Sequence, residues 1–225
     1  MARMNKVSLA RKRELDQPDR FMSMFLATTG FMKQYRKHLS IAAGGIAVLA
    51  VIVAGSVYFS KKNEAAASAM LAQVTRQHQA APDTPMAELK NHYQDIYEKY
   101  TETIAGKIAR IRYADACYET GEVETAIAAY RDARRFFKKP AIAADLTSSS
   151  LAYAHEKSGD RDNAIADFKA IAEEPASPLK ANALFNLGRL YEAAGEMEKS
   201  REAYATIVSD YPESRVAKIA REKTS

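Results

Sequence analysis

The stretch ANALFNLGRLYEAAGEMEKSREAYATIVSDYP, residues 181–212, decides the fold of this chain. Apolar residues recur at helical spacing on both sides of a central glycine, Gly195, and Pro212 follows the second half. Glycine allows the left-handed backbone that a tight turn between helices requires, and proline cannot continue a helix. The stretch therefore predicts two antiparallel helices joined at Gly195.

Two further stretches repeat this plan. KIARIRYADACYETGEVETAIAAYRDARRF (107–136) and DLTSSSLAYAHEKSGDRDNAIADFKAIAEE (145–174) carry central glycines of their own, Gly121 and Gly159. The three glycines are spaced 38 and 36 residues apart, and self-similarity at a nearly fixed period is typical of stacked repeats. Each hairpin alone leaves an apolar face bare, so we expect the three hairpins to stack into an all-α solenoid.

The three units resemble the tetratricopeptide repeat, a helix–turn–helix motif of about 34 residues. The positions that carry the resemblance are Ala114, Gly121, Ala126, Tyr130 and Ala133 in the first unit, Leu151, Ala152, Gly159, Ala164 and Phe168 in the second, and Leu187, Gly188, Tyr191, Gly195, Tyr204 and Pro212 in the third. Ser200 replaces the usual alanine, and Cys117 and His155 stand where an aromatic is usual. The resemblance covers residues 96–225 and implies a small helical solenoid, which helices at 86–100 and 213–223 would cap.

An apolar run precedes the repeats. LSIAAGGIAVLAVIVAGSVYF, residues 39–59, contains no charged residue, and at 1.5 Å per residue a helix of this length spans about 30 Å, the thickness of a bilayer core. Aromatic and basic residues flank it on both sides, as at membrane interfaces. A buried core helix and a cleavable signal peptide are the alternatives, but core helices are usually shorter, and so are the apolar regions of signal peptides. We predict a transmembrane helix at 39–59.

The charge distribution predicts the orientation of this helix. Residues 1–38 hold nine Lys/Arg and three acidic residues, a net charge of +6, so the remainder carries −1 of the total of +5. A basic segment beside a membrane helix favours anionic lipid over nucleic acid, and it favours a cytoplasmic N-terminus. Residues after 60 would then lie in the bacterial periplasm. Within 1–38, apolar residues spaced by three, four and seven also predict an amphipathic helix.

No motif of an enzyme, metal site or cofactor site occurs in the sequence. None of the four histidines has a His or Cys three or four residues away, the spacing typical of zinc sites, and there is no Gly-rich phosphate loop. The segment LTSSSLA, 146–152, holds three serines without a Gly-x-Ser-x-Gly elbow. We predict a protein without enzymatic activity, metal or cofactor. An enzyme whose site the sequence does not reveal is the remaining alternative.

The resemblance also implies a binding surface, because in tetratricopeptide domains the first helices of successive hairpins line a concave groove. The positions carried over are Ile108, Ile111, Asp115 and Tyr118 from the first unit, Ser149, Tyr153 and Glu156 from the second, and Asn182, Phe185, Arg189 and Glu192 from the third. Aromatic residues beside charges suit an extended peptide or a partner helix. The alternative is that these residues are only the solvated face of an amphipathic stack.

Together these features predict four segments: a basic cytoplasmic segment with an amphipathic helix (1–38), a transmembrane helix (39–59), a stalk helix and linker (60–84), and a repeat domain of three hairpins with capping helices (85–225). One N-terminal anchor followed by tetratricopeptide repeats resembles the YfgM-like ancillary subunits of the Sec translocon. This resemblance implies an inner-membrane protein whose periplasmic repeats bind translocon subunits, periplasmic chaperones or client proteins. A scaffold for envelope assembly or cell division, without translocon contact, is the alternative.

Overall fold

The computed structural model describes residues 20–137 and 142–224, and helices joined by turns make up both ranges. The helices are α2 (Arg20–Gln34), α3 (Arg36–Ala80), α4 (Met86–Lys99), α5 (Ile104–Glu119), α6 (Val123–Arg134), α7 (Ile142–Ser158), α8 (Arg161–Glu173), α9 (Lys180–Ala193), α10 (Met197–Asp210) and α11 (Ala217–Thr224). The basic residues predicted to fix the orientation lie in part between positions 3 and 13, outside the described residues.

The chain divides into two compact units, Met1–Phe59 and Ser60–Ser225, and the boundary falls within α3. In the first unit the apolar side chains of α3 are exposed, with Ile41 and Val51 74% and 72% accessible to solvent. An 18-residue window of α3 reaches a mean hydropathy of 2.2, and none of it is buried. Among the described residues, α3 is the one helix long and apolar enough to cross a membrane. The predicted long apolar helix near the N-terminus is confirmed.

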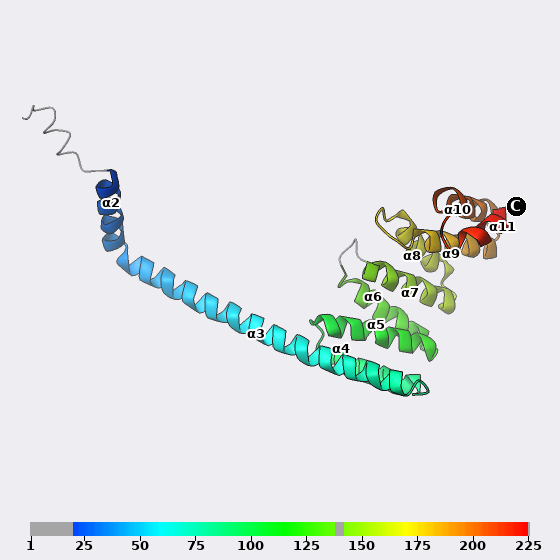
Figure 1. The fold of residues 1–225 in the computed structure, drawn as a ribbon, viewed down its shortest axis with the longest axis horizontal. Coiled ribbons are helices and arrows are strands. Elements are labelled where there is room, and N and C mark those ends of the chain that lie inside the picture. Colours follow the sequence, from blue (N-terminus) through cyan, green and yellow to red (C-terminus); the bar gives the residue numbers. More distant parts are fainter. Residues whose placement is uncertain (1–19, 138–141, 225) are drawn as a thin grey trace, which may run out of the picture. The chain divides into compact units, whose positions relative to one another are not determined.

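The second unit is a stack of helical hairpins. Helices α5/α6, α7/α8 and α9/α10 form the three hairpins, and each helix packs against the next one in the chain (Figure 1). Helix α4 packs on α5 at one end, and α11 packs on α10 at the other. The predicted all-α fold of stacked hairpins is confirmed.

The three glycine turns have the geometry that the sequence predicts. Gly121, Gly159 and Gly195 have φ angles of +84°, +86° and +78°, in the left-handed region that only glycine enters without strain. At each turn the N–H of the next residue donates to a carbonyl five residues back, for example Glu122 to Cys117 over 2.8 Å. This is the Schellman arrangement, which ends one helix and starts the antiparallel one.

Aromatic residues of the second helices fill the core. Tyr130, Phe168 and Tyr204 are 3%, 0% and 2% exposed, each sixteen positions after a small residue on the first helix of its hairpin. The third small residue is Gly188, and Ser200 beside it donates a buried hydrogen bond of 2.8 Å to the Gly188 carbonyl. Serine can therefore replace the usual alanine here, because its buried hydroxyl has a hydrogen-bond acceptor.

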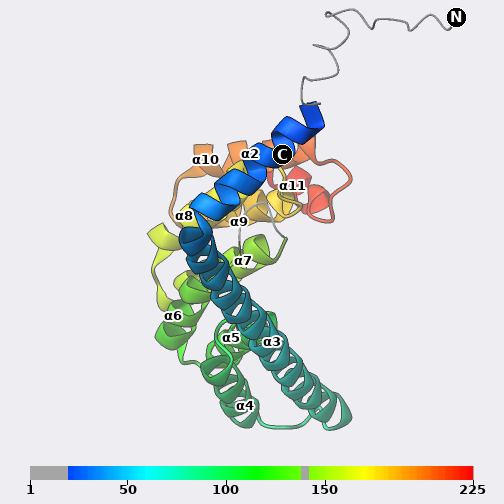
Figure 2. The same cartoon turned by 90° about the vertical axis from the view of Figure 1, so that its left-hand side faces the viewer.

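The packed unit begins at Ser60, so it includes the segment 60–84 that is predicted as a stalk helix and linker. Residues 60–80 form the second part of α3 and run alongside α4 after the loop 81–85 (Figures 1 and 2). Ala67 and Val74 are buried there, and Val74 joins the core cluster of the first hairpin. This segment is helical, as expected of a stalk, but it also covers one side of α4 and α5.

Glu64 of α3 caps the N-terminus of α5. Its two carboxylate oxygens accept hydrogen bonds from the backbone N–H groups of Ile104, over 2.7 Å, and Ala105, over 3.1 Å. The first N–H groups of a helix have no partner within the helix, and they carry the positive end of its dipole. A carboxylate is therefore the most favourable cap for them.

We predict that Glu64→Ala lowers the free energy of unfolding by about 1–2 kcal/mol, because two N–H groups of α5 lose their acceptor. The measurement is urea unfolding of the full chain in nonionic micelles, followed by near-ultraviolet circular dichroism of its 12 tyrosines. Glu102→Ala is the matched control, since Glu102 is exposed, lies just before α5, and has no hydrogen bond among the described residues. Equal losses from the two variants would contradict the capping role.

Candidate protein-binding groove

The first helices of the three hairpins, α5, α7 and α9, present corresponding positions at equal distances from their turn glycines. Three residues before the glycine stand Tyr118, Glu156 and Glu192, and six before it stand Asp115, Tyr153 and Arg189. Ten before it stand Ile111, Ser149 and Phe185, and thirteen before it stand Ile108, Leu146 and Asn182. Because each turn has the same geometry, residues at equal distances from their glycines occupy equivalent places in the three hairpins. The predicted groove therefore consists of four rows of such residues.

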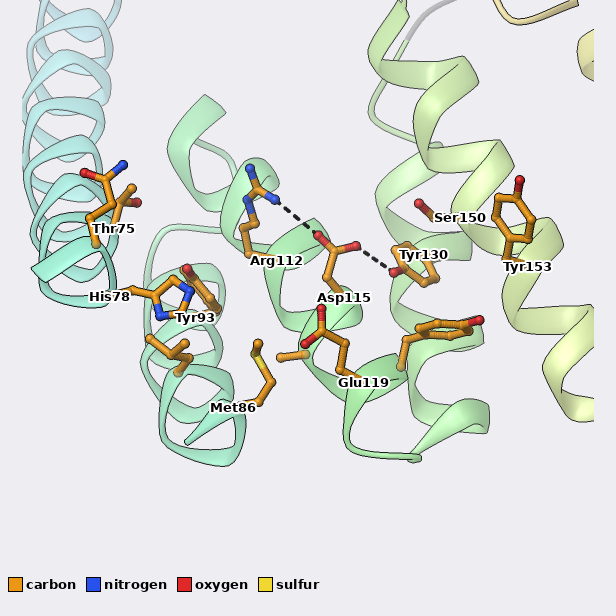
Figure 3. Close-up of a pocket in the computed structure, with 14 residues that line it drawn as sticks. Thr75, His78, Met86, Tyr93, Arg112, Asp115, Glu119, Tyr130, Ser150 and Tyr153 are labelled. Atoms are coloured by element: carbon orange, nitrogen blue, oxygen red, sulfur yellow. Dashed lines mark hydrogen bonds and ion pairs between the residues drawn. The ribbon is translucent and has the colours of Figure 1, made fainter. Parts of the chain in front are cut away.

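Two cavities lie along these rows, and Tyr153 of α7 lines both. The first has a volume of about 530 Å³ and includes Asp115 and Tyr118 (Figure 3). The second, of about 380 Å³, lies between α7 and α9 and includes Ser149, Asn182 and Phe185. Six of the eleven predicted groove residues therefore line two cavities that share one side chain.

The two isoleucines of α5 lie elsewhere. Ile108 lines a separate apolar hollow of about 410 Å³ between α3 and α5, where Leu71 and Ile104 are its neighbours. Ile111 packs partly buried against the core of the first hairpin. Both side chains were predicted to share one groove with the others because residues 60–80 were not expected to pack beside α5.

The remaining predicted residues, Glu156, Arg189 and Glu192, form ion pairs with the next hairpin or with the capping helix α11, and Tyr118 contacts the next hairpin as well. Arg189 donates two hydrogen bonds to the carboxylate of Glu156, with N–O distances of 2.5 and 2.7 Å. Lys223 of α11 binds Glu192 at 2.9 Å in the same way. Lys157 donates to the carbonyl of Tyr118 over 2.7 Å, and its ammonium lies 4.1 Å from the centre of the Tyr118 ring. These contacts hold the first helices together along their C-terminal halves.

The Arg189 side chain also orients Tyr153. Its guanidinium donates to Oδ1 of Asn186 over 3.2 Å, and the amide nitrogen of Asn186 donates to the Tyr153 hydroxyl over 2.9 Å. The Tyr153 ring packs edge-on against buried Phe168, with ring centres 5.2 Å apart. Tyr153, which lines both cavities, is therefore held at its hydroxyl by Asn186 and at its ring by Phe168.

Ionisation at the Glu156–Arg189 pair follows from this geometry. The hydrogen bonds from Arg189 lower the pKa of Glu156 below 4.5, and those to Glu156 raise the pKa of Arg189. A carboxyl with a lowered pKa stabilises the fold above its unfolded-state pKa, and this contribution is lost as the pH falls through the folded-state value. The pair therefore stabilises the stack at neutral pH and not in strong acid.

We predict that Arg189→Met lowers the free energy of unfolding by about 1 kcal/mol at neutral pH and by less in acid, once the pH has fallen through the lowered pKa of Glu156. The measurement is urea unfolding of both proteins across this range. Arg201→Met is the control, because Arg201 pairs with Glu198 within one helix and both side chains are well exposed. The assignment fails if the effect of Arg189→Met does not change with pH.

Asp115 has two partners inside the first cavity. The Tyr130 hydroxyl donates to it over 2.6 Å, and the Arg112 guanidinium lies 3.5 Å from its other oxygen, as the dashed lines in Figure 3 mark. Burial, together with the hydrogen bond to Asp115, raises the pKa of Tyr130. The phenol therefore remains a neutral donor at physiological pH.

Sequence reasoning missed two parts of this surface. Leu146 is half exposed at the register position of Ile108 and Asn182, and the spacing from the turn glycines could have identified it. The second part is the wall of the first cavity formed by Thr75, His78 and Gln79 of α3 and by Met86, Leu89 and Tyr93 of α4. No repeat signature covers α3, so only the structure places these residues beside α5.

Among the described residues, no three His, Cys, Asp or Glu side chains gather closely enough to hold a metal ion. His155, at its predicted packing position, is buried and hydrogen-bonds through Nδ1 to Asp167 of α8 over 2.9 Å. Cys117 is fully buried as a small apolar residue. The groove is thus a surface of aromatic, aliphatic and paired charged side chains.

Comparison with known proteins identifies the repeat. Residues 150–215, which contain the end of α7 and all of α8 to α10, match the family described as tetratricopeptide repeat. No curated protein matches the chain. Among solved structures, the chain is similar to the crystal structure of BtubC (BKLC) from P. vanneervenii, with 16% sequence identity, a TM-score of 0.40, and coverage of 73% of this chain and 72% of that one. The matching family describes a structural repeat and not an enzyme.

Proposed function

We propose that this protein is a membrane-anchored interaction module without enzymatic activity. In this proposal the apolar part of α3, residues 39–59, spans the bilayer, and the surface along α5, α7 and α9 binds an extended polypeptide or a helix of a partner protein. The observation that carries the proposal is the pair of cavities that share Tyr153, on a tetratricopeptide stack whose chain also has an exposed apolar helix. Tetratricopeptide repeats commonly present such extended concave surfaces to partners.

The orientation that we propose places the N-terminus in the cytoplasm and the repeats in the periplasm of a bacterium. The net charge of +6 on residues 1–38 supports it, because Lys and Arg are retained on the cytoplasmic side of a membrane helix. Lys61 and Lys62, after the span, reduce the local difference without reversing it.

The partner class that we propose is the Sec translocon with its associated chaperones and clients. The combination of one N-terminal anchor with a short tetratricopeptide stack supports this choice. A scaffold that assembles envelope or division proteins would have the same architecture. The experiment must therefore distinguish translocon binding from this scaffold role.

The experiment is co-purification of the full-length protein from membranes in mild detergent, with the bound proteins identified by mass spectrometry. We expect translocon subunits in the eluate and a marked loss of them from the Tyr153→Ala variant. Tyr211→Ala is the matched control, since Tyr211 lies at the C-terminal end of α10 and lines neither cavity. Recovery of division or envelope-assembly proteins alone would support the scaffold, and equal recovery from both variants would contradict binding in the groove.

A further inference from the structure

The first cavity is a pocket with walls from five helices. Its volume is about 530 Å³, and it lies between the second part of α3, α4, α5, α6 and α7. Figure 3 draws the side chains that line it, from all five helices. The pocket is large enough for a long side chain but not for a folded segment.

Four tyrosine rings line this pocket: Tyr93 from α4, Tyr118 from α5, Tyr130 from α6 and Tyr153 from α7. Aromatic faces carry partial negative charge and attract ammonium and guanidinium groups within about 6 Å. One ring already makes such a contact, because the Lys157 ammonium lies 4.1 Å from the centre of the Tyr118 ring. The pocket lining therefore favours a cation by its rings alone.

Glu119 adds a negative charge to the lining. It is the last residue of α5, whose C-terminal turn carries the negative end of the helix dipole and no basic side chain. Asp115, four residues earlier, places a like charge on the same face. Among the described residues, Glu119 has neither an ion pair nor a hydrogen bond. Its carboxylate is exposed at the mouth of the pocket.

The carboxylates of the predicted groove, unlike Glu119, have partners within the protein. Arg189 binds Glu156, and Lys223 binds Glu192, so each of these acids has a basic partner from the next helix pair or cap. Asp115 accepts from Tyr130 and lies near Arg112, whose side chain is 61% exposed at the rim. Glu119 is the one carboxylate of the first pocket for which the described chain supplies no basic partner.

We propose that this pocket binds a lysine or arginine side chain of the partner polypeptide, with the cation between the tyrosine rings and the carboxylate of Glu119. The inference rests on the proposed function, and it adds the chemistry of the residue that anchors the partner. An acidic side chain would be repelled by Asp115 and Glu119, and an aliphatic one would leave the Glu119 carboxylate without a counter-charge. A basic side chain satisfies both the rings and the carboxylate.

The test uses the full-length protein in nonionic micelles with 3-fluorotyrosine in place of tyrosine, so that fluorine NMR reports on the pocket rings. The probe is the peptide acetyl-Gly-Ser-Lys-Ser-Gly-amide, and its counterpart carries norleucine in place of lysine. We expect the lysine peptide to shift the resonances of Tyr93, Tyr118 and Tyr153 with a dissociation constant of about 1 mM, and the norleucine peptide to leave them unchanged.

Two charge-neutralising variants complete the test. Glu119→Gln should lower the affinity for the lysine peptide about fivefold, the loss expected for one partly exposed ion pair. Glu202→Gln should leave its affinity unchanged, because Glu202 is exposed on α10 away from the pocket. Three results would each overturn the inference: equal binding of the norleucine peptide, equal effects of the two variants, or pocket resonances that do not shift at a peptide concentration about ten times the expected dissociation constant. None of these outcomes alters the co-purification result, which tests the groove itself.

Discussion

Gly106→Ala should lower the free energy of unfolding of the repeat unit by about 3 kcal/mol or more, the largest effect that we expect from adding a single methyl group to this chain. A Cβ at this position would lie 2.8 Å from the carbonyl carbon of Tyr100 and closer still to its oxygen. That carbonyl accepts hydrogen bonds from the backbone N–H of Thr103, over 3.0 Å, and from the Thr103 hydroxyl, over 2.7 Å. The turn between α4 and α5 is therefore fixed by its own hydrogen bonds and cannot move aside cheaply.

Gly188→Ala is the graded comparison for this prediction. A Cβ there would lie 2.7 Å from Cε1 of the Tyr204 ring, which is a side chain and can shift slightly. The same position of the other hairpins holds Ala114 and Ala152, so the fold accepts a methyl group where the facing ring leaves space. We expect a loss of about 1–3 kcal/mol. Urea unfolding that ranks Gly188→Ala as the more damaging variant would contradict the backbone argument at Gly106.

Asp167→Ala should cost about 3 kcal/mol, because one carboxylate joins three helices. Its Oδ1 atom accepts from Arg134 of α6 over 2.7 Å, and its Oδ2 atom lies 2.9 Å from Nδ1 of His155 on α7. His155 is 5% exposed, so removal of the carboxylate leaves a buried ring nitrogen without its partner. The measurement is the shift of the urea midpoint at neutral pH.

A double-mutant cycle separates the hydrogen bond from the loss of volume. In the His155→Phe background, Asp167→Ala should cost about 1–2 kcal/mol less, because the ring then has no polar atom to satisfy. Lys169→Ala is the surface control on the same helix, since its pair with Glu173 is exposed and 3.7 Å long. If Asp167→Ala costs the same in both backgrounds, the His155–Asp167 contact contributes nothing to stability.

The hairpin fold could be predicted from the sequence because its determinants are local. Gly121, Gly159 and Gly195 are the residues that a left-handed turn requires, and apolar periodicity around them sets the length of each helix. The role of residues 60–80 could not be predicted. Their alanine-rich sequence is compatible with a free helix, and their burial depends on α4 folding back beside them after the loop at 81–85.

The candidate site, too, could be predicted from the sequence only in part. Tyr153 and Phe185 were carried over from the tetratricopeptide resemblance, and in the structure both line the cavity between α7 and α9. The role of Arg189 could not be predicted, because the sequence does not show that its guanidinium is bound by Glu156, thirty-three residues earlier. Charge reversal at Arg189 would therefore disturb the stack itself, and Tyr153 is the cleaner position for a test of binding.

The most direct test of the account places a photo-crosslinking amino acid at position 153, in the groove, or at position 170, on the exposed side of α8, in the full-length protein in intact cells. The account predicts discrete adducts with partner polypeptides from position 153 and not from position 170, and it predicts that these adducts remain in the membrane pellet after an alkaline wash. Adducts from position 170 alone, or release of the protein by the wash, would contradict a membrane-anchored module that binds its partners through the groove.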